Sequence, residues 1–562
     1  MAENAYTPPV DDYAFLYGRA FGLDLVARAT GGAFTAEDAV GIIEGAGEFA
    51  AGVLAPLEGV GDRVGARLVD GQVHLPEGFA DAYRQFVAAG WVTAEAPESA
   101  GGDGLPESIR AGLGEIWNAS NAAFALCWLL SAGQIHALDA AASEEIRQTY
   151  LTRLVSGEWT GTMNLTEPGA GSDLGAIRTT ATPRADGSWG ISGQKIFITW
   201  GDHDIAENIV HLVLARTPDA PAGAKGLSLF VVPKHLVGAD GSLGDRNGVT
   251  TIALEHKLGI HASPTCVLGF EDATGWLVGE VGGGLAGMFV MMNSARAGMG
   301  FQATGISDRA YQQAEAYAAQ RVQGGVLDRP EGTPIAEHPD VRRLLLSMRS
   351  RVFAMRGLGV LLGDCFDRAE VDGTGPLAEF LVPVLKGWAT EEALSITSDA
   401  IQVHGGMGFI EETGIAQHYR DARIMPIYEG TTAIQANDLI GRKVIRDSGA
   451  VAEGLFQQID ETAAALDGTD AARIRERLER AVAAARAATA ALVGFGQTRD
   501  AYAASVPYLT LIGTLAGGWV HALAALAADG DAERIRLADF YTAHHLPRVH
   551  MLAEAVAAGE IA

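Results

Sequence analysis

Residues 179–199 read TTATPRADGSWGISGQKIFIT, and they lie in the region that separates the chain's predicted helices. Asp186-Gly187 stands between two runs rich in Thr, Ile and aromatic residues, a pattern typical of a β-hairpin with a tight turn. Further runs of β-branched and aromatic residues follow at Ile209–Ala215 and Leu227–Val232. Because no helical periodicity lies between these runs, we expect residues 161–278 to form an antiparallel sheet or barrel and not βαβ units.

Apolar residues recur every three or four positions on both sides of this region, as in amphipathic helices. The predicted helices are Ala36–Leu54, Gly78–Gly90, Ile109–Leu138, Leu285–Gln320, Pro339–Asp367, Leu377–Gln402, Ile434–Val444, Ala471–Leu492 and Asp531–Ala557. We therefore predict an α+β fold that is mostly α. Its parts are an N-terminal helical domain (1–160), a middle β-domain (161–278), a helical bundle (279–446) and a C-terminal helical extension (447–562).

Composition excludes several classes of protein. The 562 residues are 48% hydrophobic and 20% charged, which is typical of a globular chain. A net charge of −28 disfavours binding to nucleic acid or to an anionic membrane surface. Cys127, Cys266 and Cys365 lie far apart, which excludes a disulfide scaffold and a thiolate zinc site.

One segment tests the expectation of a soluble protein. Residues 501–528 contain no charged side chain and are long enough to cross a bilayer. Pro507, Thr510 and His521 interrupt the segment and much of it is alanine, so a buried helix is favoured over a membrane span. The first residues show no basic stretch followed by an apolar run, and we therefore expect a cytoplasmic location.

The segment TEPGAGSD at residues 166–173 is the first candidate for ligand binding. Its glycines allow backbone N–H groups to approach a ligand, and Thr166 and Ser172 offer hydroxyls. The segment does not fit a dinucleotide-binding loop, because residues 179–191 continue as strand and not as helix. An ordinary glycine-rich turn and a ligand-binding loop both fit the local pattern.

Glu429, in the segment IYEGTT, is a candidate catalytic base. Its apolar neighbours would partly desolvate the carboxylate and raise its pKa, which suits proton abstraction near neutral pH. The alternative is a helix-entry residue, since acidic side chains favour helix starts and a predicted helix follows.

The segment QVHGGMGF at residues 402–409 is the third candidate. His404 is either a base or ligand, or a structural residue beside a glycine turn, and the second interpretation is favoured. No Cys, His or carboxylate stands at metal-ligand spacing from it, so no metal site is predicted. The chain also lacks a Gly-x-Ser-x-Gly motif and a phosphate-binding Walker loop, which argues against a hydrolase or an NTPase.

Together these segments resemble the acyl-CoA dehydrogenase family. The matching stretches are residues 97–106, 166–173, 191–199, 399–409 and 420–435, in this order over about 350 residues. The resemblance covers about residues 20–445 and implies an N-terminal helical domain, a middle β-domain and a four-helix bundle. The extension beyond 446, with the closing FYTAHHLP at 540–547, is similar to the methylmercaptopropionyl-CoA dehydrogenase-like branch of the family.

The resemblance implies an FAD-dependent α,β-dehydrogenation of an acyl-CoA thioester to the trans-2-enoyl-CoA. Glu429 matches the base that removes the α-proton, and flavin N5 would accept the β-hydride. Residues that match cofactor contacts are Leu165, Thr166, Ile198, Thr199, Arg321, Gln402, Gly405, Gly406, Thr431 and Gln435. Residues that match substrate contacts are Ser172, Asn293, Arg296 and Gly430.

The resemblance also implies partners. FAD shared between subunits, through Arg321 and the segment at Gln402, would require a homodimer or a dimer of dimers. The expected electron acceptor is an electron-transfer flavoprotein, and 3-methylmercaptopropionyl-CoA or short and medium acyl-CoA are the expected substrates. The sequence departs from the family at Phe197, where a Trp is usual, and at Val322–Gly325, where an aromatic residue usually precedes a glycine.

Two alternatives remain at this stage. An acyl-CoA oxidase would have the same helical extension but would pass its electrons to oxygen. A DNA-associated flavoprotein of this fold would need a basic surface, and acidic residues outnumber basic ones in residues 441–562.

Overall fold

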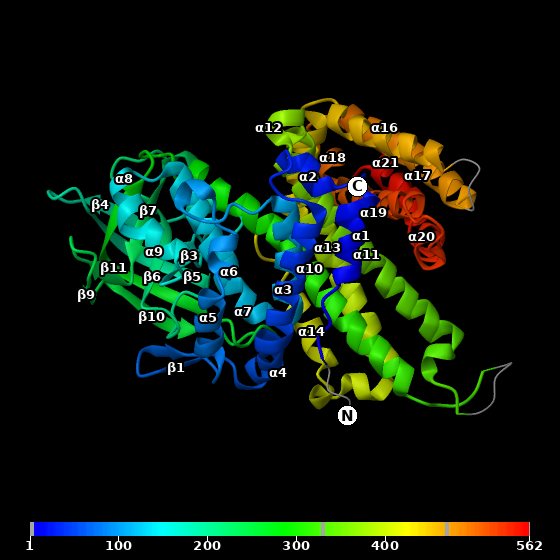
Figure 1. The fold of residues 1–562 in the computed structure, drawn as a ribbon. Helices are drawn as coiled ribbons and strands as arrows, with labels where there is room; N and C mark the ends of the chain where they lie inside the picture. The colour runs from blue at the N-terminus through cyan, green and yellow to red at the C-terminus, as the bar shows by residue number, and fades with distance from the viewer. Residues whose placement is uncertain (1–4, 327–331, 467–470, 561–562) are drawn as a thin grey trace. The chain divides into compact units, whose positions relative to one another are not determined.

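The computed structural model describes residues 5–326, 332–466 and 471–560. The chain forms two compact units (Figure 1). The sheet unit contains Pro56–Leu105 and Asn121–Ala295, and the helical unit contains Met1–Ala55, Pro106–Ser120 and Arg296–Ala562. Each unit is therefore built from segments that lie far apart in the sequence.

A seven-stranded sheet forms the core of the sheet unit. Its strands are β3 (Trp159–Asn164), β4 (Thr180–Pro183), β5 (Trp189–Thr199), β6 (Asn208–Arg216), β7 (Leu227–Pro233), β10 (Val249–Leu254) and β11 (Thr265–Val278). The strands are ordered β10-β11-β5-β4-β6-β3, and β7 pairs with both β11 and β6. These pairings close a ring of β11, β5, β4, β6 and β7 around buried side chains such as Ile191, Val213 and Phe230.

The predicted hairpin forms the β4–β5 pair. Thr180 lies opposite Ser192 and Pro183 opposite Trp189, in antiparallel register. The Asp186 carboxylate accepts hydrogen bonds from the backbone N–H and the hydroxyl of Ser188, at 3.0 and 2.7 Å. Gly187 has φ +87°, a left-handed backbone that favours glycine. Local turn chemistry therefore explains why the hairpin was predictable.

The sheet differs from a purely antiparallel one at two pairings with β6. Strand β4 meets β6 in parallel at Thr180 and Arg216, and the longer parallel pairing is that of β3. This strand pairs with β6 in parallel, from Trp159 opposite Asn208 to Asn164 opposite Val213. A parallel pair needs a long connection, and residues 165–207, which contain the β4–β5 hairpin, supply it. Two short hairpins were also not predicted, β1 (Arg67–Val69) with β2 (Gln72–His74) and β8 (His235–Val237) with β9 (Leu243–Arg246).

Long helices form the helical unit. The bundle contains α11 (Pro339–Asp367), α13 (Gly375–His404), α15 (Thr432–Ile440) and the part of α10 (Gly284–Gln320) from Arg296 onward. The C-terminal extension contains α16 (Ala450–Ala465), α17 (Ala472–Phe495), α19 (Ser505–Leu526), α20 (Ala532–His544) and α21 (Arg548–Ala558). The helix α19 packs against α11 and α13, and so joins the extension to the bundle.

Three helical segments are long and apolar enough to cross a membrane by length and composition alone, namely Ala36–Val64, Glu107–Ala141 and Ser505–Leu526. The last is α19, the segment that the sequence analysis expects to be a buried helix. Most of its apolar side chains are buried, among them Leu509, Ile512 and Leu515, whereas Leu526 at its end is 44% exposed. The helix packs among α11, α13, α17 and α21.

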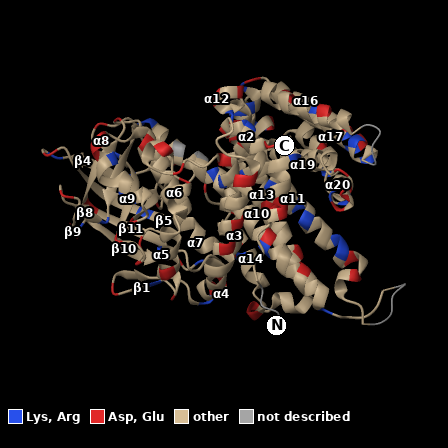
Figure 2. Ribbon diagram, viewed as in Figure 1, with Lys and Arg blue, Asp and Glu red and all other residues tan. Residues whose placement is uncertain are grey.

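Charged residues of both signs are interspersed in the helical unit (Figure 2). In the extension, arginines pair with nearby carboxylates. Arg477 lies 2.7 Å from Asp539, and Arg486 lies 3.0 Å from Glu453 and 2.7 Å from Asp460. The charges of these arginines of the extension are thus neutralised by acidic neighbours.

Candidate functional site

The predicted site residues fall into a group in each unit. Leu165, Thr166, Ser172, Ile198 and Thr199 belong to the sheet unit. The others belong to the helical unit, except Asn293, whose position on α10 is described but whose side chain lies outside the described residues. We describe each group separately.

In the sheet unit, the chain that follows β3 runs beside the end of β5. The N–H of Ile196 donates to the carbonyl of Thr166 at 2.9 Å, and Lys195 Nζ donates to the carbonyl of Leu165 at 2.9 Å. These bonds bring Leu165 and Thr166 alongside the strand that ends in Ile198 and Thr199. Ser172 lies farther along the glycine-rich segment and is exposed.

A buried ion pair holds this arrangement. Lys195 Nζ lies 2.8 Å from Glu167 Oε1, and both side chains are almost fully buried. Glu167 also accepts hydrogen bonds from the N–H groups of Arg178 and Thr179 and from the Thr179 hydroxyl. Burial raises the pKa of Glu167, but Lys195 and these hydrogen bonds outweigh it and keep that pKa below its usual value.

Burial lowers the pKa of Lys195 to about 8, and the Glu167 charge opposes this lowering without cancelling it. Neither residue is predicted from the sequence as part of a site. The available signal was a lysine in the interior of a predicted strand, where charged side chains are seldom buried without a partner.

A bulge shapes the end of β5. Cys266 pairs with Ile198 and Leu268 with Lys195, so β5 has one extra residue between these pairs. Phe197 lies in this bulge with φ +60° and is 57% exposed. Left-handed backbone is strained for an aromatic residue and often marks a functional position. The bulge sets the direction of Ile198 and Thr199 just before the chain turns at Trp200.

The donors of this group fit the flavin of FAD. The hydroxyls of Thr166 and Thr199 are partly exposed and make no hydrogen bond to any described residue. Leu165 and Ile198, next to them in sequence, are buried. Two free hydroxyls beside an apolar surface match a flat ring system with polar edges.

In the helical unit, Glu429 lies in a tight turn before α15. It has φ +53°, and Gly430 after it has φ +85°. Gln435 Nε2 donates to the carbonyl of Glu429 at 3.0 Å, and Thr431 caps α15 by accepting from the N–H of Ile434. The N–H of Glu429 donates to no acceptor in the described parts of the chain.

Two cations face the Glu429 carboxylate. Burial raises the pKa of Glu429, while Arg296 and Lys386 oppose the rise without cancelling it. Arg296 lies 3.8 Å from Asp438 on α15, the helix that also carries Gln435. The structure therefore brings Glu429, Gly430, Thr431, Gln435 and Arg296 together. A carboxylate with a raised pKa beside cations can accept a proton near neutral pH.

The remaining residues of the helical unit lie at the far end of α13. Tyr317 on α10 stacks on His404 with ring centroids 4.3 Å apart, and Arg321 follows Tyr317 by one helical turn. Gln402, Gly405 and Gly406 are exposed at the end of α13. With a rise of about 1.5 Å per residue, this end lies roughly 27 Å along the helix from Lys386.

His404 itself is structural. Its ring is buried, its Nδ1 lies 2.8 Å from the carbonyl of Ala400, and burial lowers its pKa. In residues 5–326, 332–466 and 471–560, no group of three His, Cys, Asp or Glu side chains gathers as metal ligands do.

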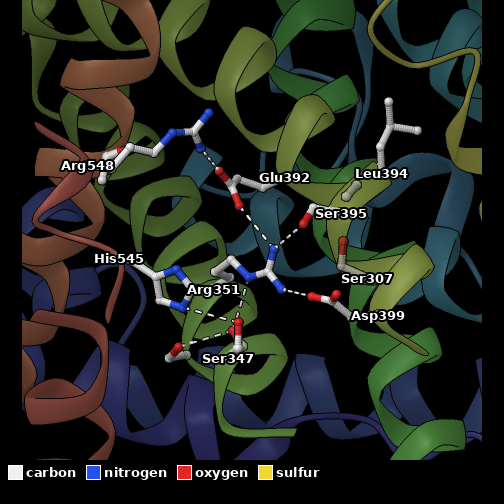
Figure 3. A network of polar contacts seen from close by, with 12 residues as sticks. Ser307, Ser347, Arg351, Glu392, Leu394, Ser395, Asp399, His545 and Arg548 are labelled. Atoms are coloured by element: carbon white, nitrogen blue, oxygen red, sulfur yellow. Dashed lines mark hydrogen bonds and ion pairs between the residues drawn. The ribbon is translucent and has the colours of Figure 1, made fainter. Parts of the chain in front are cut away.

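A cavity of about 610 Å³ lies on another side of α13, next to the C-terminal extension. Figure 3 shows the polar network along it, in which Arg351 of α11 contacts Glu392, Ser395 and Asp399 of α13. Arg548 of α21 reaches Glu392 at 3.1 Å. Since these charged groups pair with one another, we interpret the network as a connection between the bundle and the extension.

The chain matches four family models in order along its length. They are the acyl-CoA dehydrogenase N-terminal domain at residues 41–158, its middle domain at 162–273, its C-terminal domain at 282–444, and an acetyl-CoA dehydrogenase C-terminal-like domain at 455–562. All but short connecting stretches and the N-terminus are therefore covered by this family.

Individual proteins agree with these models. The chain is 51% identical to 3-methylmercaptopropionyl-CoA dehydrogenase of Ruegeria pomeroyi, over 90% of each chain. It is 36% identical, over 86% of each chain, to the broad-specificity linear acyl-CoA dehydrogenase FadE5 of Mycobacterium tuberculosis. An acyl-CoA dehydrogenase from Bacillus anthracis, solved with FAD, has the same fold with a TM-score of 0.71, at 24% identity over 86% of this chain and 84% of that one. This chain thus belongs to the acyl-CoA dehydrogenase family and is an FAD-dependent enzyme of that family.

Proposed function

We propose that the enzyme dehydrogenates 3-methylmercaptopropionyl-CoA, or short and medium straight-chain acyl-CoA, with Glu429 as its base. The observation that carries the proposal is the Glu429 carboxylate, partly desolvated and facing Arg296 and Lys386. The preference for the methylmercapto substrate rests on the identity with the Ruegeria enzyme over nearly the whole chain.

In this proposal Glu429 accepts the α-proton of the thioester at its carboxylate. An α-C–H is a weak acid, so the reaction needs charge stabilisation at the carbonyl oxygen. The free N–H of Glu429 supports a role as hydrogen-bond donor to that oxygen. FAD supplies the oxidising chemistry by taking up the β-hydride.

The hydroxyls of Thr166 and Thr199, with the backbone of Leu165 and Ile198, are proposed to hold the flavin ring. Thr431 and Gln435 are proposed to contact the cofactor near its adenine end. Ser172, Asn293, Arg296 and Gly430 are proposed as contacts of the acyl-CoA. We expect Thr199→Ala to retain FAD but to slow flavin reduction, and an unchanged rate would remove Thr199 from the site.

The cofactor site is proposed to be completed by a second copy of the chain. Gln402, Gly405 and Gly406 lie at the end of α13, roughly 27 Å along the helix from Lys386, too far to serve the same flavin. Arg321 follows Tyr317, the α10 residue that stacks on His404 at that end. The residues at this end of α13 stand beside the exposed apolar side chains Met407, Phe409 and Ile410. Exposed apolar residues next to polar ones are typical of subunit interfaces, and we propose a homodimer or a dimer of dimers.

We further propose that the enzyme works in the cytoplasm and passes its electrons to an electron-transfer flavoprotein. Peroxide formed in step with substrate consumption in air would instead indicate an oxidase. The paired arginines of the extension give no support to DNA binding.

The proposal is tested by anaerobic titration of the purified protein with a panel of acyl-CoA esters, followed by flavin absorbance. We expect 3-methylmercaptopropionyl-CoA to bleach the flavin at the lowest concentration. Bleaching by short and medium straight-chain esters alone would overturn the preference for the methylmercapto substrate, and a flavin that no ester reduces would overturn the proposed reaction.

A further inference from the structure

Helix α13 holds the turn that carries Glu429. Lys386 Nζ donates to the carbonyl of Gly430 at 2.5 Å. On the same helix, Glu391 accepts a hydrogen bond from the hydroxyl of Thr432 at 2.7 Å. The two bonds reach the residues on either side of Thr431, the N-cap of α15. Two side chains of α13 therefore hold the segment directly after Glu429, one at the backbone of Gly430 and one at the side chain of Thr432.

The backbone of this turn requires such support. Glu429 and Gly430 both have left-handed φ values, +53° and +85°. A glutamate keeps this conformation only where the surrounding structure holds it. Gln435 holds the carbonyl of Glu429, and Lys386 holds the next carbonyl along the chain.

Lys386 is also placed to act on charge. The side chain is fully buried, and an ammonium group in a protein interior requires an opposite charge. Two carboxylates face it, Glu429 from the turn and Glu391 from its own helix, and Arg296 faces it from α10. Of the two carboxylates, Glu429 has the larger effect on the charge of Lys386.

We propose that Lys386 is a positioning residue for the reaction: it holds the Glu429–Gly430 turn in place through the Gly430 carbonyl and keeps the Glu429 carboxylate ionised. This inference rests on the proposed role of Glu429 as the base.

The electrostatics agree with the geometry. Burial lowers the pKa of Lys386 to about 8, so the ammonium is charged at neutral pH, and Glu429 opposes the lowering. Lys386 and Arg296 in turn oppose the rise that burial produces in the pKa of Glu429. The other groups facing this set are Tyr428, which lies next to Glu429, and Asp438 and Arg442, which act on Arg296.

The test is Lys386→Met, which removes both the donor and the charge. In holoenzyme saturated with acyl-CoA, we expect flavin reduction to slow by roughly 10- to 100-fold, as for a misplaced catalytic group. We also expect the acid limb of its pH profile to move up by roughly one unit, the lower end of what a lost opposite charge produces. The KM should change little, because Lys386 does not touch the substrate in this account.

The matched control is Lys443→Met. Lys443 also lies in the helical unit, where it pairs with the exposed Glu379. Its loss should leave both the rate and the acid limb unchanged. If Lys386→Met does not fold, Lys386→Gln keeps a hydrogen-bond donor without the charge, and its acid limb must still move up.

The link between Lys386 and Glu429 is measured without turnover as well. The protonated carboxyl band of Glu429 is identified in infrared difference spectra by its loss in Glu429→Gln. Its titration midpoint should rise in Lys386→Gln and stay unchanged in Lys443→Met. An unmoved midpoint together with an unmoved acid limb overturns the proposal, whereas a wild-type flavin that no acyl-CoA reduces contradicts the proposed function alone.

Discussion

Glu429 occupies a position that favours reactivity over stability. Its pKa is raised by burial, so the ionised side chain is less favourable in the folded protein than in the unfolded chain. The folded protein keeps the Glu429 proton to a higher pH than the unfolded chain does. The loss of folding stability is therefore absent at pH values below the ordinary glutamate pKa, and it is complete once the pH exceeds the pKa of Glu429 in the folded protein. At neutral pH the carboxylate therefore costs stability.

We predict that Glu429→Gln gains stability relative to the wild type as the pH rises from 5 to 8. The amide has no charge to bury, so the pH-dependent penalty disappears in the variant. Thermal unfolding of both proteins at pH 5 and pH 8 measures this. The measured quantity is the stability of the variant minus that of the wild type. A lower value of this difference at pH 8 than at pH 5 would contradict the prediction.

The buried pair of Lys195 and Glu167 gives a second prediction at the residue scale. Lys195→Met leaves the Glu167 carboxylate buried without its cation, which costs about 3–5 kcal/mol of unfolding free energy. Denaturant unfolding should show this loss. The double variant Lys195→Met with Glu167→Gln should recover part of it, and no recovery would mean that the lysine acts through packing and not through charge.

At the scale of elements, α13 is central to the helical unit. One side of it holds the Glu429 turn through Lys386, and another contacts α11 and α21 through Glu392. It meets α19 where Trp388 packs directly on Gly513, so closely that a Cβ at position 513 would collide with the indole. The close approach of these two helices therefore requires glycine.

We predict that Gly513→Ala destabilises the protein by about 1–3 kcal/mol, because the added methyl overpacks a rigid contact. The control is Gly454→Ala on α16, where the space around the new Cβ is open. Alanine there should be neutral or stabilise by about 0.5–1 kcal/mol. Equal effects of the two substitutions on denaturant midpoints would contradict this account of the α13–α19 contact.

Local patterns predicted most elements but not their long-range pairings. Periodicity predicted a helix over Pro339–Asp367, the bounds of α11, and Asp186-Gly187 predicted the β4–β5 hairpin. The parallel pairing of β3 with β6 and the bulge at Phe197 depend on strands distant in sequence, so no local pattern could indicate them. The apolar residues next to Glu429 in the sequence indicated a desolvated carboxylate. The role of Lys386 is recognisable only from the packing of α13 on the turn that carries Glu429.

At the scale of the whole molecule, the division into domains at 160, 278 and 446 stays a prediction. The compact units combine segments from several of these stretches, since residues 106–120 belong with the bundle. The second whole-molecule question is the assembly, for which Met407, Phe409 and Ile410 form the candidate contact.

We predict that Phe409→Asp weakens the assembly and releases FAD together. Phe409 is 87% exposed in the single chain. A carboxylate at this position would lose its hydration if the surface were buried in an interface, and this cost would oppose assembly. The control is Val371→Asp, at an equally exposed apolar residue of the helical unit (83%). Sedimentation velocity and bound-FAD absorbance should change for Phe409→Asp only, and equal behaviour of the two variants would reject this interface.

The central claim is that Glu429 removes the α-proton. The most direct measurement is anaerobic stopped-flow reduction of the flavin by 3-methylmercaptopropionyl-CoA, in the wild type and in Glu429→Gln. The account predicts rapid bleaching in the wild type. In the variant it predicts retained FAD, a spectral shift on binding the ester, and no bleaching, since the amide cannot accept the proton. Bleaching of the variant at close to the wild-type rate would contradict the account.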